Sequence, residues 1–219
     1  MFKYIALFIV VASLTACSSL APKSYGDADV EKAAGEYSKG NFEAARTTLM
    51  SSVDKEFKDY PKAEVYTILG NVYNELYELD SAIIWHNKAL ELDPSYYEAW
   101  VNLGVCYRLK GNLSEAERCY LKAMEIESNY AELHASLGAL YIFKEQPEKA
   151  VASLQKSITI DASLPVAHSN LSLAYAYVGE YEKSEQSLIT ATSLGYKNGD
   201  LIRKQIEKIK SEALVEEVE

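Results

Sequence analysis

The sequence has no excess of basic residues, and this absence limits the partners that it can bind. Lys and Arg total 22 against 32 Asp and Glu, so the formal net charge at pH 7 is −10. Proteins gain affinity for nucleic acid by neutralising phosphates with Lys and Arg. No basic cluster is present to supply that attraction, and the acidity also disfavours broad contact with anionic lipid. We therefore exclude nucleic acid as a partner.

The sequence also lacks the residue patterns of a catalytic or metal site. A catalytic constellation needs a nucleophile beside a base, paired carboxylates in a cleft or a cluster of ligands, and none stands out. There is no glycine-rich phosphate loop, and no cysteine pair has the C-x-x-C spacing of zinc sites. The three histidines, His86, His134 and His168, occupy positions that other bulky side chains fill elsewhere in the chain, so we interpret them as packing residues. We expect no enzyme activity, metal, cofactor or small-molecule substrate.

The apolar run at the N-terminus is too short to cross a bilayer, which takes about 20 apolar residues. It begins at Tyr4 and ends at Leu14, after a basic start at Lys3. A basic start, a short apolar core and a small-residue cleavage site are typical of a secretory signal peptide. We assign residues 1–16 to this signal.

The signal ends in Leu14, Thr15, Ala16 and Cys17, a run that resembles the bacterial lipobox. The resemblance implies that the Cys17 thiol receives a diacylglycerol and that Cys17 becomes the acylated first residue, with palmitate as a typical chain. Several acyl chains anchor a protein firmly, since each buried methylene contributes about 0.8 kcal/mol. In this family an Asp after the cysteine usually signals retention in the inner membrane. Because Ser18 stands there instead, we expect the periplasmic face of the outer membrane. An ordinary signal peptide and an uncleaved anchor are the alternatives.

The other two cysteines, Cys106 and Cys119, lie thirteen residues apart in an envelope compartment that permits disulfides. The favoured interpretation is two small core residues, because an unpaired cysteine behaves as a small hydrophobe. A bridge between them is the alternative, and it requires Cα atoms within roughly 7 Å.

The dominant pattern in the chain is a repeat of 34 residues. A Leu-Gly pair recurs at this interval, and a tyrosine follows three residues after each glycine. The copies are Leu69-Gly70 with Tyr73, Leu103-Gly104 with Tyr107, Leu137-Gly138 with Tyr141, and Leu171-Ser172 with Tyr175. A fixed period of this size is typical of one supersecondary unit stacked on copies of itself, because a single unit cannot cover its own apolar face. We therefore predict a solenoid.

Further columns at the same period alternate bulky and small side chains. The bulky columns are Tyr66/Trp100/His134/His168 and His86/Tyr120/Leu154/Leu188. The small columns are Ala82/Ala116/Ala150/Ser184 and Ala89/Ala123/Ser157/Ala191. Small residues that alternate with bulky ones at a spacing of 3 to 4 indicate two antiparallel helices in close contact. Each unit is therefore expected to be a helical hairpin.

These columns resemble the tetratricopeptide repeat family. Its pattern of aromatic, Leu-Gly, Tyr, Ala, aromatic and Ala is matched by Trp100, Leu103, Gly104, Tyr107, Ala116, Tyr120 and Ala123. The resemblance implies an all-α solenoid of about five helical hairpins that binds another protein on its concave face. The proline that ends the family pattern is present only at Pro94. We therefore expect looser turns at its counterparts Ser128, Ala162 and Tyr196.

The repeats divide the chain as follows. A lipidated tether spans 17–27 and holds the repeats near the membrane, since about ten flexible residues have a root-mean-square span of roughly 17 to 20 Å. The array spans 28–198, with repeats at about 28–59, 63–96, 97–130, 131–164 and 165–198. Its first copy carries three extra residues near 60–62. Residues 199–219 are expected to form a capping helix and an acidic tail, with an apolar stripe at Ile202, Ile206, Ile209 and Ala213.

The concave face is where this family binds partners, and the outward positions of each first helix line it. In this sequence the candidate contact residues are Thr67, Asn71, Asn74, Val101, Asn102, Val105, Arg108, Ala139, Ile142, Ser169, Asn170 and Leu173. Asn side chains can donate to and accept from an extended peptide backbone, and the apolar residues can take its side chains. Asn102 and Asn170 are also common scaffold residues of these repeats. Family members that hold acidic tails use several Lys and Arg, whereas only Arg108 is present, so that ligand class is disfavoured.

The residues and resemblances together predict a membrane-anchored scaffold that binds a segment of an envelope protein. The sequence is similar to the lipoproteins of the pilotin type, which assist secretin assembly in type IV and Tad pili. A second hypothesis is an adaptor that recruits peptidoglycan hydrolases, and a third is an enzyme with an unrecognised active site.

Overall fold

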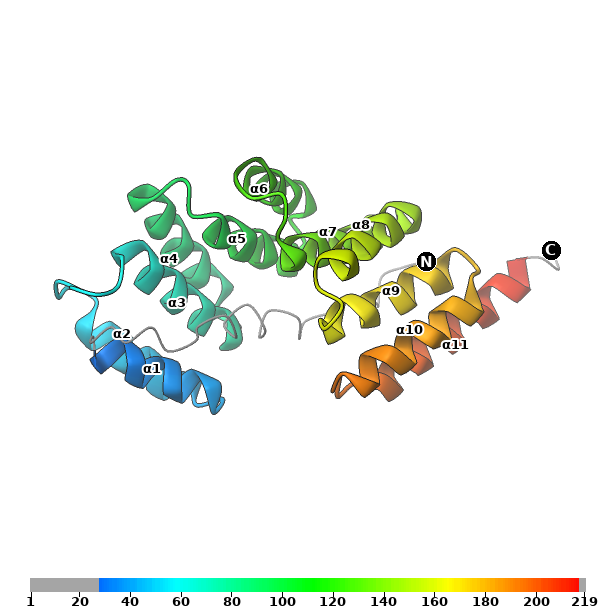
Figure 1. The fold of residues 1–219 in the computed structure, drawn as a ribbon, viewed down its shortest axis with the longest axis horizontal. Coiled ribbons are helices and arrows are strands. Elements are labelled where there is room, and N and C mark those ends of the chain that lie inside the picture. Colours follow the sequence, from blue (N-terminus) through cyan, green and yellow to red (C-terminus); the bar gives the residue numbers. More distant parts are fainter. Residues whose placement is uncertain (1–27, 217–219) are drawn as a thin grey trace. The chain divides into compact units, whose positions relative to one another are not determined.

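The structure, a computed structural model, describes residues 28–216 of the chain and the side chains of residues 28–213. Over this range the chain forms eleven α-helices and no strand (Figure 1). The predicted all-α class of paired helices is confirmed. The predicted signal peptide and the whole of the predicted tether, including Cys17, lie outside the described residues.

Consecutive helices pair into hairpins, and the hairpins gather in two compact units. The first unit contains α1 (Ala28–Ser38), α2 (Phe42–Ser52), α3 (Lys62–Glu75), α4 (Leu79–Leu92), α5 (Tyr97–Leu109) and α6 (Leu113–Ile126). The second contains α7 (Ala131–Phe143), α8 (Pro147–Ile160), α9 (Pro165–Tyr177), α10 (Tyr181–Ser193) and α11 (Gly199–Glu216). Both α8 and α9 begin with proline, which is well tolerated there because the first backbone N–H of a helix has no partner within the helix.

The glycine of each Leu-Gly pair allows the two helices of a hairpin to touch. A Cβ atom at Gly70, Gly104 or Gly138 would lie only 2.3 to 2.5 Å from the side chain opposite, which is His86, Tyr120 or Leu154 respectively. Contacts that short do not occur between real atoms, so a methyl group at any of these positions would push the helices apart. The Leu-Gly pair that recurs every 34 residues therefore marks three positions where the two helices of a hairpin are in close contact.

Each of the five first helices among the described residues is followed by a left-handed residue, and after α1 this residue is Gly40. Gly111 and Gly179 have φ near 79° and 78°, and the residue after each glycine donates its backbone N–H to the tyrosine carbonyl five residues earlier, at 2.9 Å. This arrangement satisfies carbonyls that the helix leaves open. Tyr77 and Glu145 hold the equivalent positions with φ of 59° and 56°. Two hairpins thus place a side chain where glycine is preferred.

The two turns between hairpins at Pro94 and Ala162 are closed by the same pair of hydrogen bonds. The Asp93 carboxylate accepts hydrogen bonds from the Ser95 backbone N–H and hydroxyl at 2.9 and 2.6 Å. Asp161 and Ser163 repeat this pair at 2.8 and 2.7 Å. The expectation of a looser turn at Ala162 is therefore wrong, because the hydrogen bonds of an Asp-x-Ser motif close this turn without a proline.

The core of the first unit is built from the repeated positions and, between α2 and α3, from side chains of a longer connection. Val65, Leu69 and Val72 of α3 are buried with side chains from α1 and α2. Nine residues, 53–61, connect α2 to α3, whereas four connect α4 to α5. Phe57 and Tyr60 from the longer connection pack against this cluster. The extra residues predicted near 60–62 are thus taken up by the connection before α3.

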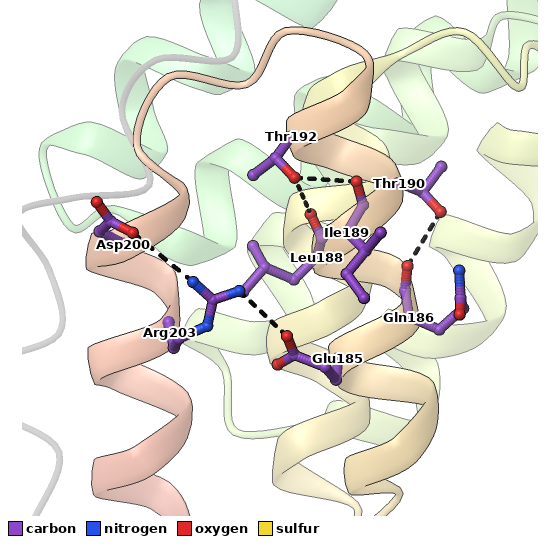
Figure 2. Close-up of polar contacts among 8 residues, drawn as sticks. All are labelled: Glu185, Gln186, Leu188, Ile189, Thr190, Thr192, Asp200 and Arg203. Carbon is purple, nitrogen blue, oxygen red and sulfur yellow. Dashed lines mark hydrogen bonds and ion pairs between the residues drawn. The ribbon is translucent and has the colours of Figure 1, made fainter.

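The last helix, α11, covers the apolar side of the final hairpin. Ile202 and Ile206 are buried in one cluster with residues of α9 and α10, and Ile209 packs against it. Figure 2 shows Arg203 reaching Glu185 of α10, at 3.1 Å, and Asp200 of its own first turn, at 3.7 Å. Exposed ion pairs contribute little free energy, so the buried isoleucines hold this helix in place.

Candidate protein-binding face

The first unit presents the accessible part of the face predicted to bind a partner. Asn71 and Asn74 lie on α3, Asn102 lies on α5, and all three side chains are partly exposed. The Cys106 thiol lies 3.8 Å from the Asn74 side-chain oxygen, to which it donates a weak hydrogen bond. Because Asn102 is one helical turn before Cys106, the asparagines of α3 and α5 share one side of the unit. We call Asn71, Asn74 and Asn102 the asparagine face.

The other predicted contact residues of this unit are buried. The hydroxyl of Thr67 donates to the Ala63 carbonyl at 2.9 Å, so it is satisfied within its own helix. Val101 and Val105 are less than a tenth exposed. These three side chains support the asparagine face from below rather than forming its surface.

Arg108 is buried among groups of its own hairpin, with 5% of its surface exposed. Burial raises the pKa of Tyr120 and raises the pKa of Cys106 to about 12, and in both cases the guanidinium of Arg108 opposes the rise. The Arg108 charge therefore lies close to both side chains. Arg108, which the sequence predicts as a contact residue, is therefore not exposed on this face.

In the second unit, the predicted contact residues are all buried. Ala139 and Ile142 of α7 and Leu173 of α9 belong to the same apolar cluster as Ile202 and Ile206 of α11. The sequence predicts an open apolar stretch at Ile142 and Leu173, but neither is open. The periodic pattern shows which side chains face one way, whereas it does not show that α11 packs over this end of the array.

Ser169 and Asn170 complete the predicted set on α9. Both are buried, and neither the Ser169 hydroxyl nor the Asn170 side-chain nitrogen has a hydrogen-bond partner among the described residues. Buried polar atoms normally find partners. Neither residue is exposed on the predicted face in this structure.

The two described cysteines are free and buried, so the alternative of a bridge between Cys106 and Cys119 is not realised in the structure. Burial raises the pKa of Cys106 to about 12 and that of Cys119 to about 11. Thiols with such pKa values stay protonated at neutral pH and react slowly. Both behave as the small core residues of the favoured interpretation.

The histidines are also packing residues. His86 and His134 are buried, and the Nε2 atom of half-buried His168 donates to the Ala162 carbonyl at 2.9 Å. Trp100, in the same column, donates to the Pro94 carbonyl at 2.9 Å. Within residues 28–213, no group of three or more His, Cys, Asp or Glu side chains could hold a metal ion. The helices of this range include none long and apolar enough to span a membrane.

Comparisons with known proteins agree with this architecture. Tetratricopeptide repeat models match residues 63–96, 97–130 and 131–164. An uncharacterized protein of Methanocaldococcus jannaschii is 36% identical over 58 residues, which are 26% of this chain and 67% of that protein.

Solved structures share the fold at low identity. A thermophilic tetratricopeptide repeat protein of Thermus thermophilus matches with a TM-score of 0.70 and 21% identity, over 83% of this chain and 96% of that one. Pseudomonas aeruginosa pilF matches with a TM-score of 0.66 and 20% identity, over 84% of each chain. YrrB, described as a tetratricopeptide repeat protein with an unusual peptide-binding site, matches with a TM-score of 0.52 and 24% identity, over 67% of this chain and 74% of that one. Residues 63–164 of this chain are therefore three tetratricopeptide repeats.

Proposed function

We propose that this protein is a non-enzymatic scaffold that binds an extended segment of another protein. The observation that carries the proposal is the asparagine face. Asn71, Asn74 and Asn102 come from adjacent hairpins, keep part of their surface exposed and lie within helices. Each amide can both donate to and accept from a peptide backbone. Affinity would come from many modest contacts on a surface that is already formed.

The scaffold is proposed to be attached to the periplasmic face of the outer membrane. Support comes from the lipobox-like run that ends at Cys17 and from Ser18 after it. Mass spectrometry of the N-terminal peptide from native membranes tests this address. Diacylglycerol and an acylated amine on Cys17 are expected. A mature chain that begins elsewhere would remove the anchor from the proposal.

The partner is proposed to be a segment of a pilus secretin, of the type IV or Tad kind. The sequence resemblance to pilotin-type lipoproteins motivates this choice, and the backbone likeness to pilF is compatible with it. Deleting the gene and imaging secretin multimers in the envelope tests the role. We expect multimers to be lost or misplaced. Intact multimers together with altered hydrolase localisation would favour the adaptor role instead.

The proposal that the protein performs no reaction has a separate test. The purified chain without its lipid should process no cell-wall substrate when it is incubated alone. Turnover by the pure protein would reject the scaffold in favour of an enzyme.

A further inference from the structure

His86 is a titratable side chain at the centre of the α3–α4 hairpin, and the scaffold role makes no use of it. It is fully buried, and its ring lies against the Cα of Gly70, where an added Cβ would be 2.5 Å from the ring atom Cε1. Neither ring nitrogen has a hydrogen-bond partner among the described residues. The matching positions hold Tyr120, Leu154 and Leu188. The α3–α4 hairpin therefore has an imidazole ring that can become positively charged, at a position where the other three hairpins have a side chain that cannot.

No charged group near this hairpin compensates a proton on His86. Burial alone lowers its pKa, from the ordinary value of 6.5 to about 3. The ionisable neighbours of Gly70 on α3 are Tyr66, whose ring meets the Trp85 ring edge to face, and Tyr73, whose ring lies under the Arg46 guanidinium. On α5 the thiol of Cys106 donates a hydrogen bond to the Asn74 side-chain oxygen. The pKa of His86 is not shifted by the charged residues of α3, α4 and α5. These residues are Lys62, Glu64, Glu75, Asp80, Lys88, Glu91, Glu98 and Arg108.

We propose that the α3–α4 hairpin is an acid-sensitive element, which separates when His86 takes up a proton. The contact between the ring and Gly70 leaves no space for the water that a charged imidazole needs, and no acceptor is present inside. A buried charge without a partner is strongly unfavourable. Protonation is therefore coupled to opening of the hairpin.

The direction of the pH effect follows from the two pKa values of His86. In the closed hairpin its pKa is about 3, and in the open hairpin it returns towards 6.5, so opening takes up a proton between these values. The opening constant should be independent of pH above about 6.5 and should rise about tenfold for each pH unit below it.

The same opening would affect partner binding, a consequence that rests on the proposed function. Asn71 follows Gly70 directly, and Asn74 lies one turn further along α3. When α3 leaves α4, the asparagine face loses its support. An acidic envelope would then release the bound segment.

Amide hydrogen exchange, followed by mass spectrometry on the chain without any partner, tests the opening itself. Exchange is recorded from pH 7.5 to 4.5 and divided by the intrinsic rate at each pH. Between pH 7.5 and 5.0 we expect the opening constant of residues 62–92 to rise about 30-fold. Residues 165–193, where Leu188 replaces the histidine, should rise much less. The absence of a rise in residues 62–92 would overturn the proposal, whatever the fate of the scaffold role.

Three variants identify the group that titrates. His86→Leu places the residue of the α7–α8 hairpin at this position and should abolish the pH dependence in residues 62–92. His86→Tyr, which copies Tyr120, should do the same and serves if the leucine variant does not fold. The matched control, His168→Leu, should keep the wild-type slope. Equal slopes in wild type and His86→Leu would reject the proposal. NMR titration of the His86 ring at pH 6 to 7 in the folded protein would reject it too.

Discussion

At the scale of single residues, the contact that defines three of the hairpins is a glycine of the first helix against a large side chain of the second. The sequence predicts the glycine column and the bulky column, because both recur every 34 residues. It does not predict how short the contacts are, since period alone contains no distance. The structure shows that the space is smaller than one methyl group at Gly70, Gly104 and Gly138.

Gly104→Ala should therefore destabilise the protein by about 1 to 3 kcal/mol, the usual cost of an overfilled core. The new methyl group would meet the Tyr120 ring at 2.5 Å. Urea unfolding followed by circular dichroism measures the change. Gly35→Ala in α1 is the matched control, because nothing lies within 4 Å of its added Cβ, and it should stabilise by about 0.5 to 1 kcal/mol. Similar effects of the two variants would contradict the close-contact account.

The buried cysteines lead to a second expectation at this scale. With pKa values of about 12 and 11, Cys106 and Cys119 should react with a thiol reagent at pH 8 only after unfolding. The Cys17→Ser chain is used, so that only these two thiols are counted. Rapid labelling of either thiol in the folded chain, or a Cys106–Cys119 bridge in non-reducing peptide maps, would show that the core is organised differently.

At the scale of helices and turns, local side chains replace the residues that the family pattern leads one to expect. The turn at Ala162 lacks proline, yet it has the same Asp-x-Ser hydrogen bonds as the turn at Pro94. The motif is present in the sequence, and a search for side chains that cap turns would have found it. The left-handed Tyr77 and Glu145 could be inferred only by aligning them with Gly111 and Gly179.

Removing the Asp161 carboxylate should weaken the turn between α8 and α9. Asp161→Ala loses two hydrogen bonds to Ser163 and should destabilise by about 1 kcal/mol. These bonds lower the pKa of Asp161, so their stabilisation is present above the ordinary aspartate pKa and is lost as pH falls through the lowered pKa. Thermal unfolding at pH 7 and in strong acid measures both effects. Equal loss of stability at both pH values would contradict this account.

At the end of α3, a substitution of Tyr77 is expected to stabilise the protein rather than destabilise it. Its φ of 59° disfavours any side chain, and 67% of its surface is exposed, so little packing offsets the strain. Tyr77→Gly should stabilise the protein by about 1 kcal/mol. Tyr77→Ala keeps a Cβ and should show no comparable gain. A stabilised alanine variant would mean that the exposed ring, and not the backbone, is unfavourable.

At the scale of the whole molecule, the repeated hairpins were predictable from the sequence, whereas the exposure of the predicted binding face was not. The period identifies residues at equivalent positions of their repeats, such as Asn71 and Leu173, without showing which of them another helix covers. The apolar stripe of α11 was recognised, but its burial against Leu173 required coordinates. The polar part of the predicted face therefore becomes the part to test.

Site-specific photocrosslinking in living cells tests the central claim most directly. A photoreactive residue replaces Asn71 or Asn102 on the asparagine face, and the matched control replaces Glu91, an exposed residue of α4 in the same unit. The account predicts crosslinks from Asn71 and Asn102 to one envelope protein, with a secretin as the expected product, and none from Glu91. The same product from all three positions, or none from the asparagine face when the protein is folded and present, would contradict the account.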